Sequence, residues 1–253
     1  MPVFALWSGP RSRSTAFFRS MLERGDLVAL HEPLEGLHFL GPMQIAAQTF
    51  ATPPELLSWL VHETEDRAVF LKETVNPPVQ ELVLADHHFV AEVHHAFLIR
   101  RPEEIAASYY ALEGDMRILE TGLELLRDLF VAVRHAGTHA PVVIDSDDLV
   151  TRPAETMAAY CASVGLPFVA DALQWEQGER PEWSHSSRWH EDAAASSRFE
   201  QPRHPDRYGL ATHPEVLRFA KRHTPFYEEL RDHRLDVAPS PSVDSDHEGR
   251  RGQ

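Results

Sequence analysis

Short apolar runs alternate with segments of helical periodicity along most of the chain. The first run, residues 3–7, carries β-favouring side chains and ends at Ser8-Gly9-Pro10, which predicts a buried strand followed by a loop. Four later runs predict further strands and read LVALHEPL, AVFLKE, HHAFLIR and PVVID. Because helical patterns separate these strands, we predict a three-layer α/β fold in which helices flank a central parallel sheet.

The helical segments are defined by apolar spacing and by their end signals. From Ser14 onward, apolar side chains recur at helical spacing until Gly25, which predicts the helix end. Further helices are expected from Pro102 and over residues 54–65, 78–88, 116–136, 151–164 and 213–233. We expect a single domain over residues 1–234. The remaining residues, 235–253, are rich in proline, serine and charge, which predicts a disordered tail.

Composition narrows the classes of partner. The 253 residues include 24 Lys+Arg and 39 Asp+Glu, giving a formal net charge of −15, which disfavours nucleic acid and anionic membrane surfaces. A few arginines can still form a local pocket for a small anion. The lone Cys161 cannot form an internal disulfide, and its apolar helical surroundings predict a core position. No run is long enough to span a membrane and the start lacks signal-peptide features, so we expect a soluble, cytoplasmic protein.

The loop after the first predicted strand has the composition of an anion site. It lies within FALWSGPRSRSTAFF, where a tight turn and the start of a helix direct backbone N–H groups and partial positive charge outward. Arg11 and Arg13 add full charges, and the hydroxyls of Ser12, Ser14 and Thr15 can donate to phosphate or sulfate oxygens. The alternative is a helix cap with two solvated arginines. A Walker A loop is disfavoured because Arg13-Ser14 stands where that motif has Gly-Lys.

This loop resembles the donor-binding loop of sulfotransferases that use 3′-phosphoadenosine 5′-phosphosulfate (PAPS). In those enzymes the loop reads PRSGST or PKSGTT and binds the 5′-phosphosulfate, which implies a P-loop-like variant of the predicted fold. The positions that match are Pro10, Arg11, Ser12, Ser14 and Thr15. Arg13 replaces the usual glycine. Either the backbone differs there or the Arg13 side chain points away from the phosphate.

A second stretch, FLIRRPEEIAASYY, resembles the site for the donor's 3′-phosphate. The family places an arginine at a strand end and a serine eight residues later, and Arg100 and Ser108 have that spacing. The arginine offers a bidentate fork to phosphate. In isolation, Arg100 could be an ordinary strand-end charge and Ser108 a packing residue. The late segment WHEDAAASSRFE also resembles a bacterial subgroup, which implies that Arg198, and similarly Arg203, could contact the 3′-phosphate.

Sulfuryl transfer requires a base and cations that stabilise the leaving phosphate. Arg11 is the first candidate for the leaving group, and Lys72, at the end of AVFLKE, is the second cation. Related enzymes place a Lys-Thr-His triplet there with its histidine as base, whereas this chain reads Lys72-Glu73-Thr74. In the bacterial subgroup a Glu-Pro at the second strand end supplies the proposed base, which implies that role for Glu32. His190 is the alternative base.

Two expectations concern the histidines. Neighbouring residues of a strand face opposite ways, so we expect only one of His31 and Glu32 to lie in the site. The histidines at 87, 88, 94 and 95 have no carboxylate or cysteine at ligand spacing, so we predict no metal site and no metal requirement.

We therefore expect a PAPS-dependent sulfotransferase acting on a hydroxyl or amine of a small, partly apolar acceptor. Residues 34–60, 112–136 and 170–200 are expected to frame the acceptor site. One alternative is a P-loop-like phosphotransferase, which needs Mg²⁺ and a Walker lysine. The other is a non-catalytic relative that only binds a nucleotide. Arg100 and Ser108 favour the first reading because ATP has no 3′-phosphate. The sequence makes no prediction of the oligomeric state.

Overall fold

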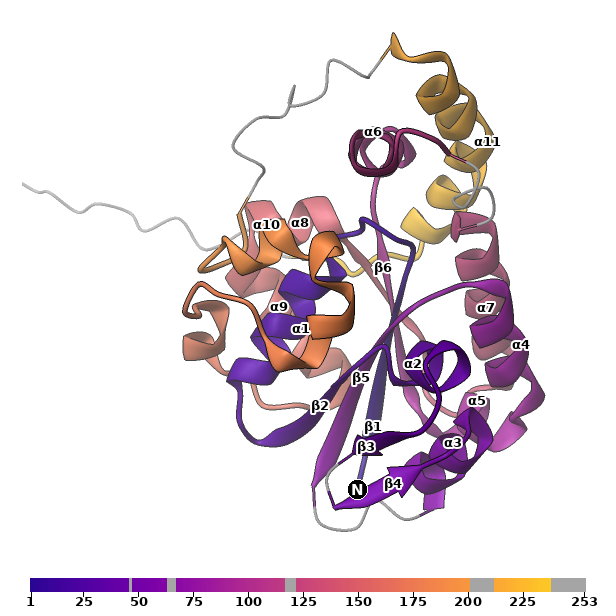
Figure 1. The fold of residues 1–253 in the computed structure, drawn as a ribbon, viewed down its shortest axis with the longest axis vertical. Coiled ribbons are helices and arrows are strands. Elements are labelled where there is room, and N and C mark those ends of the chain that lie inside the picture. Colours follow the sequence, from indigo (N-terminus) through magenta and orange to yellow (C-terminus); the bar gives the residue numbers. More distant parts are fainter. Residues whose placement is uncertain (46, 63–66, 117–121, 201–211, 238–253) are drawn as a thin grey trace, which may run out of the picture.

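Five parallel strands form the central sheet of the protein (Figure 1). The structure is a computed structural model that describes residues 1–45, 47–62, 67–116, 122–200 and 212–237. Within these residues the strands lie in the order β2-β5-β1-β6-β7, and all are parallel, as the alternating pattern predicts. Their bounds are β1 Val3–Ser8, β2 Leu27–His31, β5 Ala68–Thr74, β6 His94–Ile99 and β7 Val142–Asp145. A separate antiparallel hairpin pairs β3 (Met43–Ile45) with β4 (Gln48–Phe50).

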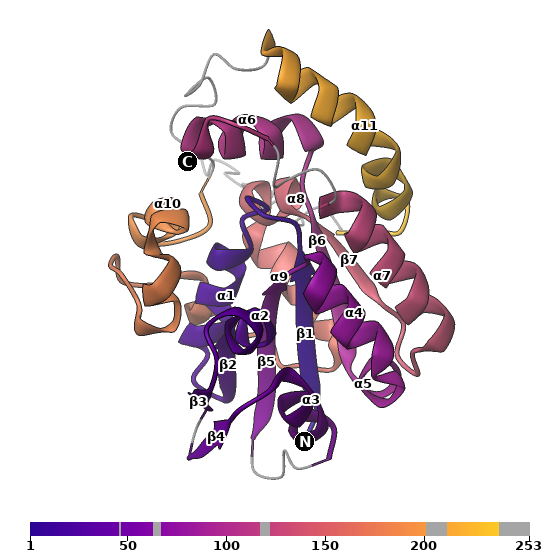
Figure 2. The same cartoon turned by 45° about the vertical axis from the view of Figure 1, so that its right-hand side comes forward.

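Helices cover both faces of this sheet, which confirms the three-layer α/β prediction (Figures 1 and 2). One face packs against α1 (Ser14–Glu23), α8 (Ser146–Thr151) and α9 (Pro153–Val164). The segment that follows contains η2 (Ala170–Leu173), η3 (Pro181–Trp189) and α10 (Glu191–Ala194). The other face packs against α2 (Pro33–Phe39), α3 (Pro53–His62), α4 (Pro77–Ala85), α5 (His87–Glu92), α6 (Pro102–Glu113), α7 (Gly122–Ala136) and α11 (Pro214–Arg231).

Strand β1 shows why helices must cover both faces of the sheet. All six of its residues are buried. Val3, Ala5 and Trp7 join the core on one face, and Phe4 and Leu6 join the core on the other. A parallel strand with two buried faces has this continuous apolar sequence rather than an alternating one.

Several element boundaries differ from the predicted ones. The helix expected over 78–88 is two helices, because Asp86 ends α4 and its side chain accepts a hydrogen bond from Phe89 N (2.9 Å) to cap α5. The helix expected over 151–164 is preceded by the short α8, capped by Asp145 through Asp147 N (3.0 Å). Helix α2 and the β3–β4 hairpin were missed. Cys161 is buried, as predicted. Residues 238–253, most of the predicted tail, lie outside the described residues.

The parallel arrangement brings the carboxyl ends of the strands to one edge of the sheet. Residues that follow β1, β2, β5 and β6 therefore meet there although they are far apart in sequence. Ligands of open α/β sheets bind at this edge. It is also the edge on which the predicted site residues fall.

The bond between Tyr227 and Asp145 fixes the last helix to this edge. The Tyr227 hydroxyl of α11 donates to Asp145 Oδ2 at 2.7 Å, and both side chains are buried. Replacing Tyr227 by Phe removes the donor and should lower the free energy of unfolding by about 1–3 kcal/mol, because a buried carboxyl oxygen loses its partner. Urea unfolding measures this change. Tyr110→Phe, at a half-buried position on α6, is the matched control and should change stability by less than about 0.5 kcal/mol. Equal effects of the two substitutions would contradict the assignment.

Candidate active site

The loop between β1 and α1 is held in an unusual backbone conformation. Arg11 and Arg13 both have positive φ, 59° and 67°, a region that L-residues other than glycine adopt at a cost of about 1–2 kcal/mol. Ser12 lies between them, and its buried Oγ has no hydrogen-bond partner in the described part of the chain. Ser14 and Thr15 then begin α1 and are also buried. Strained backbone and an unpaired buried hydroxyl are typical of a loop built to hold a ligand.

The structure shows how the anion-binding loop accommodates Arg13 in place of the usual glycine. Its backbone, at φ 67° and ψ 17°, keeps the left-handed conformation that glycine adopts most easily. Its side chain is directed to α6 and α8: the guanidinium donates to Glu104 Oε2 and Asp147 Oδ1, each at 3.1 Å, and to the Ser146 hydroxyl at 3.1 Å. The loop therefore has a glycine-like shape with an arginine anchored outside it. A donor contact by Arg13 stays a prediction.

Arg11 and Arg100 join the two predicted anion-binding stretches. Arg11 Nε donates to Ser108 Oγ at 3.0 Å, across 97 positions of sequence. Arg100 Nη1 donates to the Arg11 carbonyl oxygen at 2.7 Å, and its Nε donates to Glu104 at 2.9 Å. Burial and the neighbouring Arg13 lower the pKa of Arg100 to about 10, so the group stays charged at neutral pH. The structure brings these predicted residues together at the sheet edge.

A buried ion pair lies beside this anion site. Lys72 is 2% exposed, so it is not a solvated strand end, and its Nζ donates to Glu32 Oε1 at 2.5 Å. The Thr74 hydroxyl donates to the same oxygen at 2.6 Å. Burial alone would raise the pKa of Glu32, but the charge and hydrogen bond of Lys72, together with the hydrogen bond from Thr74, outweigh burial and hold that pKa well below its usual range. Glu32 is consequently an ionised carboxylate at physiological pH.

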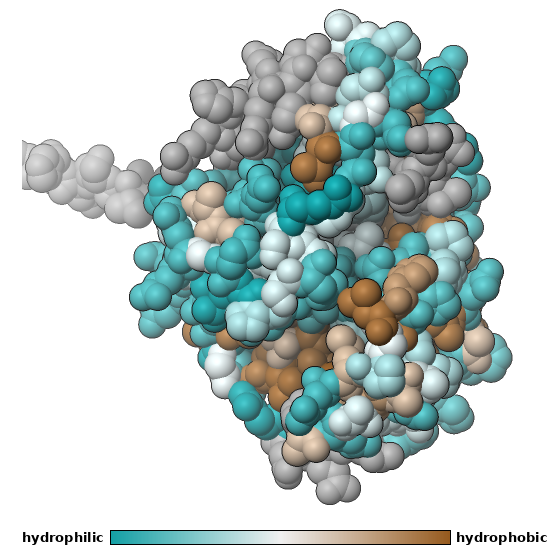
Figure 3. Space-filling view, viewed as in Figure 1, coloured by the Kyte–Doolittle hydropathy of each residue, from teal (hydrophilic) through white to brown (hydrophobic). Residues whose placement is uncertain are grey.

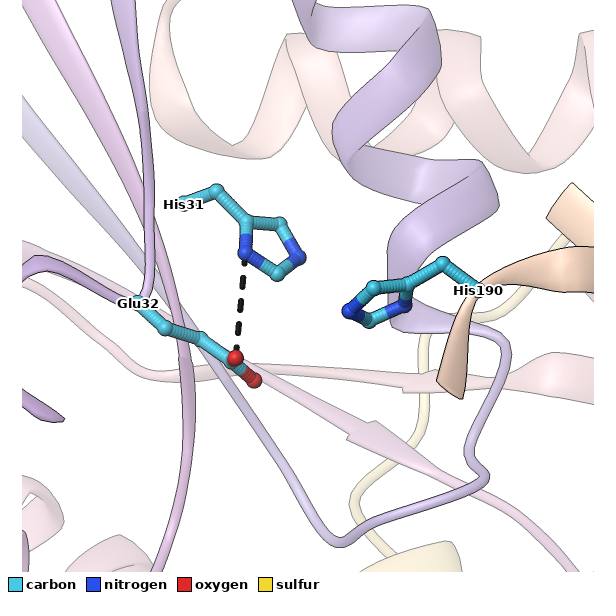
Figure 4. Close-up of side chains that lie close together, drawn as sticks. All are labelled: His31, Glu32 and His190. Atoms are coloured by element: carbon cyan, nitrogen blue, oxygen red, sulfur yellow. Dashed lines mark ion pairs between the residues drawn. The ribbon is translucent and has the colours of Figure 1, made fainter. Parts of the chain in front are cut away.

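His31, Glu32 and His190 lie together, which corrects the expectation that His31 and Glu32 face opposite ways (Figure 4). The alternation of a strand ends at His31 because Glu32 has left-handed dihedrals, φ 49° and ψ 46°. His31 Nδ1 is 3.7 Å from Glu32 Oε2. His190 Nδ1 forms a hydrogen bond with the Thr15 hydroxyl (2.9 Å), which links it to the anion-binding loop.

Both imidazoles are neutral at physiological pH. Burial, reinforced by the charge of Lys72, lowers the pKa of His31 to about 2 and that of His190 to about 3. A neutral imidazole can accept a proton or coordinate a metal through an unprotonated nitrogen.

Two carboxyl groups near this pair were not singled out from the sequence. Glu73 is fully buried and accepts a hydrogen bond from Leu34 N (2.5 Å), and burial together with the charge of Glu32 raises its pKa well above the usual range. Burial and the same neighbouring charge raise the pKa of Glu35 to about 7. Glu73 follows the predicted site residue Lys72 directly in the strand, and Glu35 follows Glu32 by one helical turn. These two sequence positions are the signals by which Glu73 and Glu35 could have been found.

Three further residues complete the account of the candidates. The Arg198 side chain is 70% exposed and pairs with Glu200 at 3.3 Å, and a donor contact by Arg198 stays a prediction. Arg203 lies outside the described residues. His95 is buried against Trp7, whose Nε1 donates to it at 2.9 Å. Among the described residues, the other predicted non-ligand histidines, 87, 88 and 94, form no group of three metal-ligating side chains.

Two solved structures share this fold. The sulfotransferase domain from the olefin synthase of Synechococcus PCC 7002 matches with a TM-score of 0.57 and 16% identity, covering 88% of this chain and 94% of that domain. The sulfotransferase domain from the curacin biosynthetic pathway matches with a TM-score of 0.51 and 15% identity, covering 96% and 94%. The fold is therefore of the P-loop-like α/β class found in sulfotransferases.

The family follows from the sequence comparison. The family described as a sulfotransferase domain matches residues 1–233, so this chain belongs to it. A curated relative, branched-chain-amino-acid aminotransferase-like protein 2 of Arabidopsis thaliana, is 28% identical over 249 residues. That alignment covers 92% of this chain but only 42% of the relative, so the chain spans less than half of the relative's length. Among the described helices, none combines the length and apolar character needed to cross a membrane.

The left-handed conformation at Arg13 leads to a stability prediction. Arg13→Gly and Arg13→Ala both remove the ion pairs with Glu104 and Asp147, but only glycine adopts positive φ without steric cost. The glycine variant should therefore be more stable than the alanine variant by about 1 kcal/mol. Urea unfolding of the two variants measures the difference. An alanine variant as stable as the glycine variant would show that the loop does not hold this conformation.

Proposed function

We propose that this protein transfers a sulfuryl group from PAPS to a hydroxyl or amine of a small acceptor. The observation that carries the proposal is the meeting of the two anion-binding stretches through Arg11, Ser108 and Arg100. A donor with a 5′-phosphosulfate and a 3′-phosphate needs two such stretches close together. Membership of the sulfotransferase family supports the same reaction class.

The anion-binding loop suits the donor's 5′ end. Positions 11–15 supply backbone N–H groups at the start of α1, and helix N-termini bind phosphate and sulfate. The buried Ser12 Oγ has no hydrogen-bond partner within the described ranges and can donate to such an oxygen. Pro10 completes the turn, while Ser14 and Thr15 add hydroxyls. At the other end, Arg100 and Ser108 are the proposed ligands of the 3′-phosphate, as the family pattern implies.

In the proposed reaction each charged side chain has a separate task. Glu32 accepts the proton that the acceptor loses as its oxygen or nitrogen bonds to sulfur. Arg11, with Lys72, stabilises the negative charge that remains on the phosphate oxygen when its bond to sulfur breaks. Because the acceptor becomes more acidic as the new bond forms, a carboxylate with a low pKa can serve as base. His190 is the alternative base, since it is neutral and adjacent.

The acceptor end of the site is partly apolar. Phe39 and Leu40 are 60% and 65% exposed at the end of α2, the helix that begins directly after Glu32. Figure 3 shows a mostly hydrophilic face with an apolar patch where Figure 1 draws this helix. Seven helical residues span about 10 Å, so the apolar side chains lie within reach of a small molecule held at Glu32. This placement supports a partly apolar acceptor.

Thermal shift with nucleotides tests the donor assignment. Adenosine 3′,5′-bisphosphate at a hundredfold excess over its Kd should stabilise the protein by about 2.7 kcal/mol, or about 5–10 °C in Tm. AMP should give a smaller shift because it lacks the 3′-phosphate, and Arg100→Gln should reduce the bisphosphate shift to that of AMP. Stabilisation by ATP with Mg²⁺ but not by the bisphosphate would favour a phosphotransferase and reject the proposal.

The role of Glu32 is tested by an isosteric substitution. Glu32→Gln should leave bisphosphate binding intact and reduce transfer about 10²- to 10⁴-fold, since general-base catalysis contributes that range. Bisphosphate release from PAPS, followed with a panel of alcohols, phenols and amines, measures transfer. Glu55→Gln is the matched control, because in the described structure Glu55 accepts a hydrogen bond from Ala51 N at the start of α3 and bonds to no residue of the site. Undiminished turnover in Glu32→Gln would remove Glu32 as base and leave His190.

A further inference from the structure

We infer that His31, Glu32 and His190 form a binding site for a divalent transition metal, with Zn²⁺ as the best match, and that its occupancy inhibits transfer. The inhibition rests on the proposed function, whereas the metal site itself does not. The metal is proposed as an inhibitor and not as a cofactor, because the reaction proposed above uses no metal.

The three side chains converge from separate elements. His31 ends β2, Glu32 precedes α2, and His190 follows η3. One ligand atom from each lies within 4.8 Å of the others, and all three residues are buried. In Figure 4 both imidazole rings are directed toward the region around the carboxylate. Two imidazole nitrogens and one carboxylate oxygen are a ligand set that zinc accepts, with remaining positions for water or substrate.

The unpaired ring nitrogens of His31 are a second observation, independent of the clustering, that points to a bound ligand. Its side chain has no exposed surface, yet neither ring nitrogen has a hydrogen-bond partner among the residues that the structure describes. Buried polar groups almost always have a partner, so this histidine calls for one. The nearest charged atom, Glu32 Oε2, is 3.7 Å from Nδ1, which is too long for a hydrogen bond. A metal bound to both atoms would satisfy the nitrogen.

Neighbouring residues hold the ligands in place from outside. Lys72 and Thr74 both donate to Glu32 Oε1, so the carboxylate is fixed with Oε2 toward His31. The Thr15 hydroxyl bonds to His190 Nδ1 and orients that ring. Ser186 bonds to His190 Nε2 at 3.1 Å and would yield this nitrogen to the metal. Such outer contacts orient the ligands of metal sites.

The ammonium of Lys72 weakens the site and makes it sensitive to substitution. A positive charge next to Glu32 repels a second cation, so zinc should bind reversibly. A metal on Glu32 Oε2 would also occupy the electron pair that accepts the acceptor's proton. Bound zinc would therefore stop the reaction without changing the donor-binding loop.

Zinc titration of the full chain without donor tests the site. Isothermal titration calorimetry should detect one strong Zn²⁺ per chain, weakened at least tenfold by His190→Ala and by His31→Asn. Lys72→Met should tighten binding at least tenfold, because it removes the competing charge. Weaker binding by the histidine variants could arise from a damaged fold. Tighter binding by Lys72→Met could not, because a damaged protein would not gain affinity for zinc. Unchanged or weaker binding in Lys72→Met would overturn the proposal.

The chain has 16 histidines in total, and a matched control addresses those outside the proposed site. His94 and His139 stack with ring centroids 3.8 Å apart, and both are partly exposed. His94 begins β6, so it lies at the opposite end of that strand from the site. His139→Asn should leave the strong zinc site unchanged. If that variant loses the binding while His190→Ala keeps it, the signal is an adventitious ion only and the proposal fails.

Inhibition is measured separately. Zinc at saturating concentration should abolish bisphosphate release from PAPS, and EDTA should restore it. If zinc-free enzyme shows no transfer to any acceptor while Lys72→Met still binds zinc more tightly, the proposed function fails and the metal site stands. Full transfer by zinc-saturated enzyme would overturn the inhibitory role.

Discussion

The buried pair of Lys72 and Glu32 organises this end of the molecule. Two opposite charges removed from water are stable only when they are close together and further hydrogen-bonded. Here the sheet supplies both conditions, because β5 lies beside β2 and the backbone N–H of Glu32 donates to the Lys72 carbonyl oxygen at 2.7 Å. The left-handed conformation of Glu32 then directs its carboxylate to the ammonium. The position of α2, which begins at the next residue, follows from this pair.

The pair also determines the charge state of its neighbours. Burial, together with the charge of Glu32, raises the pKa values of Glu35 and Glu73. Burial, reinforced by the ammonium of Lys72, keeps His31 and His190 neutral. Carboxyl and imidazole groups at the sheet edge therefore have different protonation states at one pH, which is a common property of catalytic sites.

Most of the sheet and the anion-binding stretches could be predicted from the sequence, because they depend on local signals. Apolar runs identify buried strands, and the spacing from Arg100 to Ser108 is short enough to see in one segment. The cluster around Glu32 could not be predicted in the same way. It depends on one left-handed residue, which ends the alternation assumed for His31, and on His190, which reaches the site from 175 positions beyond Thr15. The exposure of the Arg198 side chain likewise depends on tertiary packing rather than on sequence pattern.

The arginine at position 13 has a consequence for ligand binding. A glycine there would let the loop sample many backbone conformations before a ligand arrives. Arg13 instead connects the loop to Glu104 on α6 and Asp147 on α8, so the loop is held in one shape by two helices that follow other strands. A loop ordered in advance loses less conformational entropy on binding. The anion-binding loop is thus preorganised by the rest of the sheet edge.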